Sequence, residues 1–191
     1  MHKLEKENLK HLSWLVNGRI NLMDEAMMRT MADSGCVGIY YGLESGSDDI
    51  LKQINKGFTA EKAKRVVLQS KKYFGKVMVS FIYGFPIESM ADFYDTLFLA
   101  IFLFDKGVDV HRHLLSPLPL TPLYERYKDS LSFSQDLISD ISWEGSVRSI
   151  SSEVLGLIKK YPQVFTSFYH FDSPDLLKKK DCVDKTSKQQ E

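Results

Sequence analysis

Apolar residues recur with two different periods along the first two thirds of the chain, and the changes of period predict alternating strands and helices. Short apolar runs predict strands at residues 14–21, 37–43, 76–83 and 108–115. Apolar residues at helical spacing predict helices at residues 24–34, 47–57, 59–75 and 88–106. Strands that alternate with helices are typical of a parallel sheet with crossover connections. We therefore expect an α/β fold with about four parallel strands.

The pattern changes after residue 128, which predicts three regions. Residues 1–128 would form the sheet domain. Residues 129–177 would form a helical and irregular accessory segment, with a helix near 151–160 and an aromatic stretch at 162–171. Residues 178–191 are polar and include a run of three lysines, so we expect a solvated, disordered tail there.

Each predicted strand carries small or polar residues on one face, because side chains alternate with a period of two. If that face lines the inside of a curved sheet, it encloses a cavity bordered by Arg19, Glu44, Ser80 and His113. Gly42 and Gly84 would leave room for a ligand near the backbone. The opposite faces are apolar and predict a layer covered by helices.

These residues also have structural interpretations. Arg19 and Glu44 could form a structural ion pair instead of contacting a ligand, and spacing alone does not separate the two. His111 and His113 would most often pack or form hydrogen bonds, although two imidazoles at this spacing on a strand can bind a metal ion.

Composition narrows the classes of function. Lys and Arg together number 25, as do Asp and Glu, so the chain lacks the positive surplus expected of a protein that binds nucleic acid through bulk charge. Hydrophobic residues make up 43% of the sequence, enough for a buried core. The longest apolar run, residues 96–104, is too short to span a bilayer, and we expect a cytoplasmic protein.

Three segments together resemble the C-terminal half of the radical SAM core domain, most of all that of the cobalamin-associated radical SAM proteins. They are GCVGIYYGLESGSDDILKQINKGFT, VSFIYGFPIESMADFYDTL and LSPLPLTPLYERY, and they follow one another within residues 14–127. The resemblance implies an incomplete (β/α) barrel, in which S-adenosylmethionine lies across the carboxyl ends of the strands.

The same resemblance implies roles for residues at the first two strand ends. Glu44, in the GLES motif, would lie near the ribose or the amino-acid part of S-adenosylmethionine. Arg19 would reach its carboxylate, which is the weakest of these assignments.

Further residues would lie along the adenine. Ser80, Ile82 and Gly84 match a G-x-I-x-G stretch, with Ser80 in place of the first glycine. Leu115 and Ser116 leave the last strand where backbone groups commonly meet the adenine. Leu120 departs from the usual Pro-Gly-Thr motif, and a residue other than glycine there is expected to alter the loop.

The resemblance also implies a four-iron, four-sulfur cluster and, in full-length relatives, cobalamin. The family holds its cluster on a C-x-x-x-C-x-x-C loop, but this sequence contains two cysteines only, Cys36 and Cys182. Two cysteines cannot supply a cysteine-only cluster site. We therefore predict a fragment of a radical SAM enzyme that carries part of the S-adenosylmethionine pocket and is inactive alone.

Two other functions stay open. One is a metal-dependent hydrolase that uses His111 and His113 as ligands. The other is a noncatalytic interaction module. The first strand would be an exposed edge unless residues 1–12 or a partner cover it. The expected partners are the missing N-terminal half or a second copy of the chain, with neither nucleic acid nor membrane.

Overall fold

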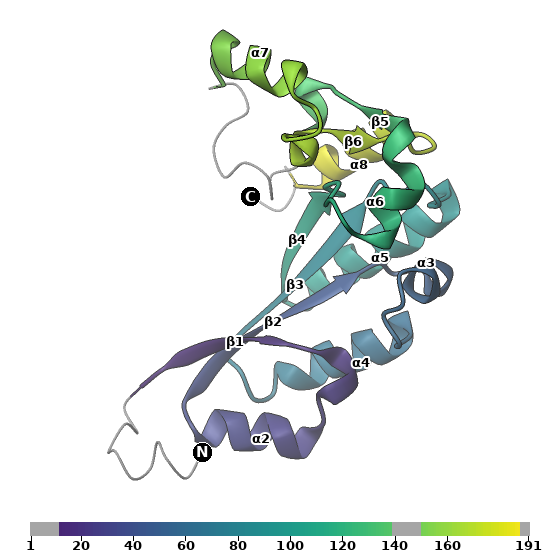
Figure 1. Cartoon of the computed structure of the whole chain (residues 1–191). Helices are drawn as coiled ribbons and strands as arrows, with labels where there is room; N and C mark the ends of the chain where they lie inside the picture. The colour runs from purple at the N-terminus through teal and green to yellow at the C-terminus, as the bar shows by residue number, and fades with distance from the viewer. Residues whose placement is uncertain (1–11, 139–149, 188–191) are drawn as a thin grey trace. The chain divides into compact units, whose positions relative to one another are not determined.

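A computed structural model describes residues 12–138 and 150–187 (Figure 1). The chain divides into two compact units. The first unit comprises residues 1–81 and 91–111, and the second comprises residues 82–90 and 112–191. The boundaries of these units fall within two strands of the sheet and at the start of a helix, and the expected change at residue 128 stays a prediction.

Four parallel strands form one open sheet in the order β1-β2-β3-β4, which confirms the predicted fold class. The strands are β1 (Trp14–Gly18), β2 (Cys36–Glu44), β3 (Lys76–Tyr83) and β4 (Asp109–Leu114). The elements between them are η1 (Ile20–Leu22), α2 (Glu25–Asp33), α3 (Asp48–Gln53), α4 (Ala60–Ser70) and α5 (Met90–Asp105). All of these strands and longer helices lie within a few residues of their predicted positions.

Local sequence explains where these helices begin. The side chains of Asp24, Ser47 and Thr59 each accept a hydrogen bond from the backbone N–H three residues later, as N-cap residues do. Gly35 follows α2 with a φ of +93°, the left-handed conformation that ends many helices.

The core of the first unit lies between one face of the sheet and the helices α2, α4 and α5 (Figure 1). Ile39, Tyr41 and Leu43 of β2 are fully buried and alternate with less buried residues, as predicted. They pack in one cluster with side chains such as Met28 of α2 and Val67 of α4. Burial of each large apolar side chain contributes about 1.5–3 kcal/mol, so this layer supplies most of the stability of the sheet.

The second unit combines short elements from distant parts of the sequence. They are α6 (Pro122–Tyr127), η2 (Lys128–Ser130), β5 (Leu131–Ser132), η3 (Gln135–Leu137), α7 (Ser152–Lys160), η5 (Thr166–Phe168), β6 (His170–Phe171) and α8 (Leu176–Ser187). β5 pairs with β6 in antiparallel orientation. A small apolar cluster of Ile138, Ile150 and Ile158 packs with Phe133 and Phe165.

The C-terminal region departs from the sequence-based expectation. The helix expected near residues 151–160 is present as α7. Where a disordered tail was expected, the structure has the helix α8. Lys179, from the predicted solvated run of lysines, is fully buried in it. Residues 1–11, most of the segment that could cover the edge of the first strand, lie outside the described residues. Residues 188–191, the end of the predicted tail, also lie outside them.

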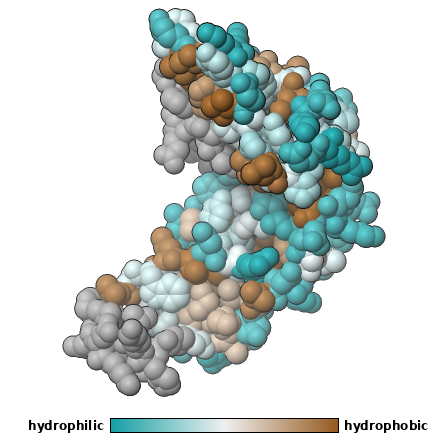
Figure 2. Space-filling view, viewed as in Figure 1, coloured by the Kyte–Doolittle hydropathy of each residue, from teal (hydrophilic) through white to brown (hydrophobic). Residues whose placement is uncertain are grey.

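Exposed apolar side chains are separated by hydrophilic ones on the side of the molecule that Figure 2 draws. Within residues 12–138 and 150–187, no helix has the length and apolar character needed to cross a membrane.

Candidate functional site

Glu44 ends β2 in an unusual backbone conformation. Its φ is +67°, in the left-handed region that residues with a side chain rarely adopt. The regular pairing of β2 with β3 also breaks between Gly42 and Glu44. Strained backbone of this kind costs about 1–3 kcal/mol and is concentrated at functional sites. Asn55, Leu120 and Asp175 also have a positive φ, but of these four residues only Glu44 ends a strand of the sheet.

The carboxylate of Glu44 pairs with Lys56. The Lys56 Nζ lies 2.9 Å from Glu44 Oε1 and donates a second hydrogen bond, of 3.3 Å, to the carbonyl of Gly42. Both side chains are partly accessible, with 19% of Glu44 and 27% of Lys56 exposed. The pair therefore presents a carboxylate and an ammonium group to solvent at the same strand end.

Arg19 does not form the structural ion pair considered from the sequence. Its side chain is exposed, at the start of η1, and the described part of the chain gives it no ion pair. Lys56 takes that role and was missed, because it lies in a turn after α3 whose approach to β2 depends on the tertiary fold.

Gly42 has a different role from the one predicted. A Cβ at Gly42 would lie 2.5 Å from Glu44 Oε1, so the space beside this glycine is filled by the Glu44 carboxylate. The glycine thus admits the side chain of Glu44, two residues away, and the expectation that it leaves room for a ligand was wrong.

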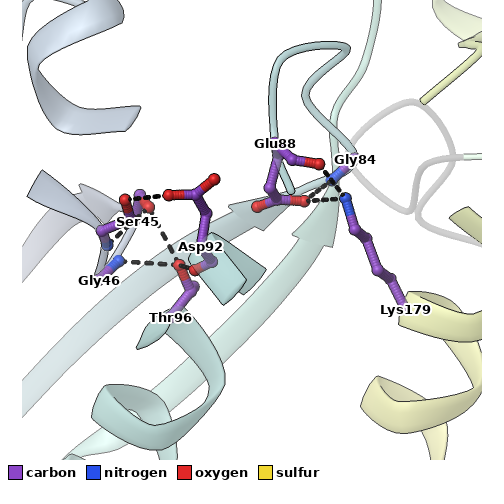
Figure 3. Close-up of polar contacts among 8 residues, drawn as sticks. Ser45, Gly46, Gly84, Glu88, Asp92, Thr96 and Lys179 are labelled. Carbon is purple, nitrogen blue, oxygen red and sulfur yellow. Dashed lines mark hydrogen bonds and ion pairs between the residues drawn. The ribbon is translucent and has the colours of Figure 1, made fainter. Parts of the chain in front are cut away.

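A hydrogen-bond network centred on the Thr96 hydroxyl holds the loop that follows Glu44 (Figure 3). The Thr96 hydroxyl, on α5, donates to the carbonyl of Asp92 and accepts from the N–H of Gly46 at 2.9 Å. Since its one proton is used, Thr96 accepts from the Ser45 hydroxyl at 3.0 Å. The Ser45 oxygen in turn accepts from the N–H of Ser47 at 3.0 Å. The Thr96 hydroxyl therefore ties the three loop residues to α5.

Close backbone contact reinforces this network. A Cβ at Gly46 would lie 2.5 Å from the carbonyl oxygen of Asp95 and 2.8 Å from the Cα of Thr96, so only glycine fits. The Ser47 hydroxyl donates to Asp92 Oδ1 at 2.6 Å. The S-G-S sequence thereby fixes the direction in which the chain leaves Glu44.

The predicted residues of β3 fall in both units. Ser80 is buried in the first unit and is paired in register with Gly42. Ile82 is half-buried and Gly84 buried, both in the second unit. Gly84 has a φ of +88°, and a Cβ there would lie 2.8 Å from Leu114 and 2.9 Å from Leu176. The space that a side chain at Gly84 would need is thus occupied by two leucine side chains, and the expected contact of Gly84 with the adenine stays a prediction.

A buried carboxylate holds the turn after Gly84. The N–H of Gly84 donates to Glu88 Oε2 at 3.0 Å, and the N–H of Glu88 donates to the carbonyl of Phe85 at 3.0 Å. Lys179 pairs with the same carboxylate at 3.0 Å (Figure 3). Sequence reasoning did not identify Glu88 or Lys179.

The residues that leave β4 lie in the second unit. The N–H of Leu115 donates to the carbonyl of Tyr83 at 2.9 Å, and the hydroxyl of Ser116 donates to the carbonyl of Ser167 at 3.3 Å. Leu120, which replaces the expected glycine, has a φ of +67° and is 91% exposed. The loop therefore keeps the left-handed conformation that suits glycine, with a leucine in it.

The structure gives no support to a metal centre within its described residues. There, no group of three or more His, Cys, Asp and Glu side chains is arranged to hold a metal ion. His111 lies 3.4 Å from Asp109 and contacts the ring of Tyr40. The Cys36 thiol is buried and donates to the carbonyl of Gly38, and burial raises its pKa, which disfavours the thiolate form that binds metals.

The model of the radical SAM superfamily matches residues 1–100, more than half of the chain. The chain belongs to the radical SAM superfamily. The similarity includes β1, β2 and β3, and with them Arg19, Glu44, Ser80 and Gly84.

Two curated relatives illustrate this membership. An uncharacterized methyltransferase of Pyrococcus horikoshii is 29% identical over 144 residues, which are 74% of this chain and 29% of that protein. A tRNA-2-methylthio-N(6)-dimethylallyladenosine synthase of Deinococcus radiodurans is 34% identical over 98 residues, 49% of this chain and 19% of that protein. The chain thus spans less than a third of the length of these relatives.

A solved structure supports the same fold. The radical S-adenosylmethionine methyltransferase TsrM from Kitasatospora setae, solved with cobalamin and an iron–sulfur cluster bound, has a TM-score of 0.62 and 18% identity. The alignment covers 92% of this chain and 33% of that one. The predicted incomplete barrel is therefore the fold of this chain.

Proposed function

We propose that this chain supplies S-adenosylmethionine-binding strands of a radical SAM protein, with the end of β2 as its principal contact. The observation that carries the proposal is Glu44, held in a strained left-handed conformation with a partly exposed carboxylate. The rigid loop after it supports the proposal, because a binding group must be held in place to be effective.

The chemistry of the β2 end suits S-adenosylmethionine. A carboxylate accepts hydrogen bonds from ribose hydroxyls or from an ammonium group, and the Lys56 ammonium donates to a carboxylate. The pair at 2.9 Å therefore matches both the ribose and the amino-acid part of the ligand. Arg19 is exposed and available to a carboxylate. Ser80, Ile82, Gly84, Leu115 and Ser116 remain proposed adenine contacts.

The residues present do not fit the iron–sulfur cluster. Cys36 and Cys182 are the two cysteines of the sequence, and Cys36 is buried with its pKa raised by burial. We propose that the chain does not generate a radical alone, since its two cysteines cannot supply the three ligands of the family's cluster loop. Anaerobic reconstitution with iron and sulfide tests this: a cluster absorbance with stoichiometric iron would contradict it.

The relatives support a reaction class. One is named a methyltransferase and another a methylthio-adenosine synthase, so we propose that the parent reaction transfers a methyl or methylthio group. The acceptor is left unassigned.

Calorimetric titration with S-adenosylmethionine tests the binding proposal. We expect Glu44→Gln, which keeps the shape but loses the charge, to weaken binding by about tenfold or more, since a charged hydrogen bond is worth about 1.5–3 kcal/mol. The matched control is Glu61→Gln, whose side chain is 73% exposed on α4. Equal, tight binding by Glu44→Gln and the unchanged protein would overturn the assignment.

Two alternatives keep their own tests. A hydrolase based on His111 and His113 requires stoichiometric zinc, manganese or iron in the purified protein, which elemental analysis measures. An interaction module requires a partner, either a separate N-terminal half or a second copy. A stable monomer in size-exclusion chromatography with light scattering would argue against self-association.

A further inference from the structure

Two opposite charges are completely buried within the second unit. Glu88 and Lys179 both have 0% of their side chains exposed, and Lys179 Nζ lies 3.0 Å from Glu88 Oε2. The same ammonium donates to the backbone carbonyl of Glu88 at 2.7 Å (Figure 3). Burial of a charge costs several kcal/mol, and a close partner is needed to offset it. A pair retained at such a cost suggests a specific task.

The task of Glu88 is visible in its second hydrogen bond. Its Oε2 atom, the one that pairs with Lys179, also accepts the N–H of Gly84 at 3.0 Å. Gly84 has a φ of +88°, a left-handed backbone conformation that residues with a side chain rarely adopt. The carboxylate therefore fixes the orientation of the Gly84 peptide.

Lys179 stabilises the charged form of Glu88. Desolvation disfavours the charge of a buried carboxylate, and the ammonium group 3.0 Å from Oε2 offsets this cost. A neutral acid is a weaker acceptor for the Gly84 N–H than a carboxylate paired with an ammonium group. Lys179 thus acts on Gly84 through Glu88.

The helix α8 contacts this turn at a second point. Leu176 lies one turn before Lys179 on α8. A Cβ added to Gly84 would lie 2.9 Å from the Cδ1 atom of Leu176. One side of α8 therefore supplies both a methyl group against Gly84 and the ammonium group for Glu88. Glu88 and Lys179 are 91 residues apart in the sequence. Their contact therefore forms only when α8 packs against the turn.

We propose that Lys179 is a positioning residue, which holds the 84–88 turn in its binding conformation through Glu88. The functional part rests on the proposed function, in which Gly84 lies along the adenine of S-adenosylmethionine. It adds that the far C-terminal helix, outside the matched residues 1–100, sets the affinity of that turn for the ligand.

Hydrogen exchange of the Gly84 amide tests the positioning without any ligand. We expect exchange to be about tenfold faster in Lys179→Met, because loss of one charged hydrogen bond costs about 1.4 kcal/mol or more. Lys178→Met, at an exposed neighbour on α8, is the matched control and should leave the rate unchanged. Unchanged exchange in Lys179→Met would overturn the proposal.

Two further variants distinguish a local change at Gly84 from loss of the whole fold. Lys179→Arg keeps the charge and should retain most of the protection of Gly84. The double variant Glu88→Gln/Lys179→Met removes both charges while leaving an amide oxygen for Gly84, and it should recover the fold if Lys179→Met loses it. If both variants exchange as fast as Lys179→Met, the charge pair is not what orients Gly84.

Titration with S-adenosylmethionine separates this inference from the proposed function. We expect about tenfold weaker binding by Lys179→Met than by Lys178→Met. If the unchanged protein does not bind, the proposed function fails, and the exchange data still decide whether Lys179 holds the turn. If it binds and Lys179→Met binds equally well, the positioning role fails while the proposed function stands.

Discussion

The ends of β2 and β3 are fixed by different chemistry. The loop after β2 is held by the hydroxyls of Ser45 and Thr96, by the hydrogen bond from Ser47 to the Asp92 carboxylate and by the close approach of Gly46 to α5. The turn after β3 is held by two buried charges, Glu88 and Lys179. Removing a hydroxyl from the loop after β2 breaks hydrogen bonds between neutral groups, whereas removing Lys179 takes an ammonium group away from a fully buried carboxylate. The two strand ends should therefore respond very differently to single substitutions.

Removing Lys179 should give the largest effect. We expect Lys179→Met to lower the free energy of unfolding by about 3–5 kcal/mol, because the fully buried Glu88 carboxylate loses the ammonium group 3.0 Å away. Urea unfolding followed by circular dichroism measures this, with Lys178→Met as control. Neutralising both charges in Glu88→Gln/Lys179→Met should restore much of the loss. A loss below about 1 kcal/mol in Lys179→Met would mean that the charge is not desolvated.

Thr96→Val should have an intermediate effect at the end of β2. Valine keeps the shape of threonine but leaves the N–H of Gly46 and the hydroxyl of Ser45 without their acceptor, which costs about 1–3 kcal/mol. Thr30→Val is the control, because the Thr30 hydroxyl is exposed and donates only to the carbonyl of Ala26 in its own helix. Equal urea midpoints for the two variants would show that the network does not hold the loop.

The loop after β4 offers the smallest effect and the opposite sign. Leu120→Gly removes a left-handed strain of about 1–2 kcal/mol, and the greater freedom of glycine in the unfolded chain offsets about 0.5–1 kcal/mol of this gain. A net stabilisation of about 0–1.5 kcal/mol should follow in thermal unfolding. Leu118→Gly, also exposed but outside the left-handed region, should destabilise instead. Destabilisation by both would remove the strain argument.

The order of elements could be predicted because its signals are local. Strand periods, the N-caps Asp24, Ser47 and Thr59, and the glycine after α2 act within a few residues. The faces of β2 also followed from alternation, and they place Glu44 on the side opposite the buried Ile39, Tyr41 and Leu43.

The contacts of the candidate site could not be predicted in the same way. Lys56 reaches Glu44 only after α3 has turned the chain back, and the irregular pairing beside Glu44 has no sequence signal that we could identify. Lys179 lies in a run of three lysines, a composition that indicates solvent, and its partner is remote in the sequence. Burial of one lysine in such a run is decided by tertiary packing and not by local preference.

The two cysteines differ in accessibility, so a label on one of them can report whether α8 is docked. Cys36 is buried, with its thiol pKa raised, whereas Cys182 is partly exposed on α8, three residues beyond Lys179. A thiol-reactive fluorophore should therefore label Cys182 selectively in the folded protein, because the thiolate is the reactive form. The undocking of α8 could then be followed by fluorescence in real time, without introducing any new cysteine.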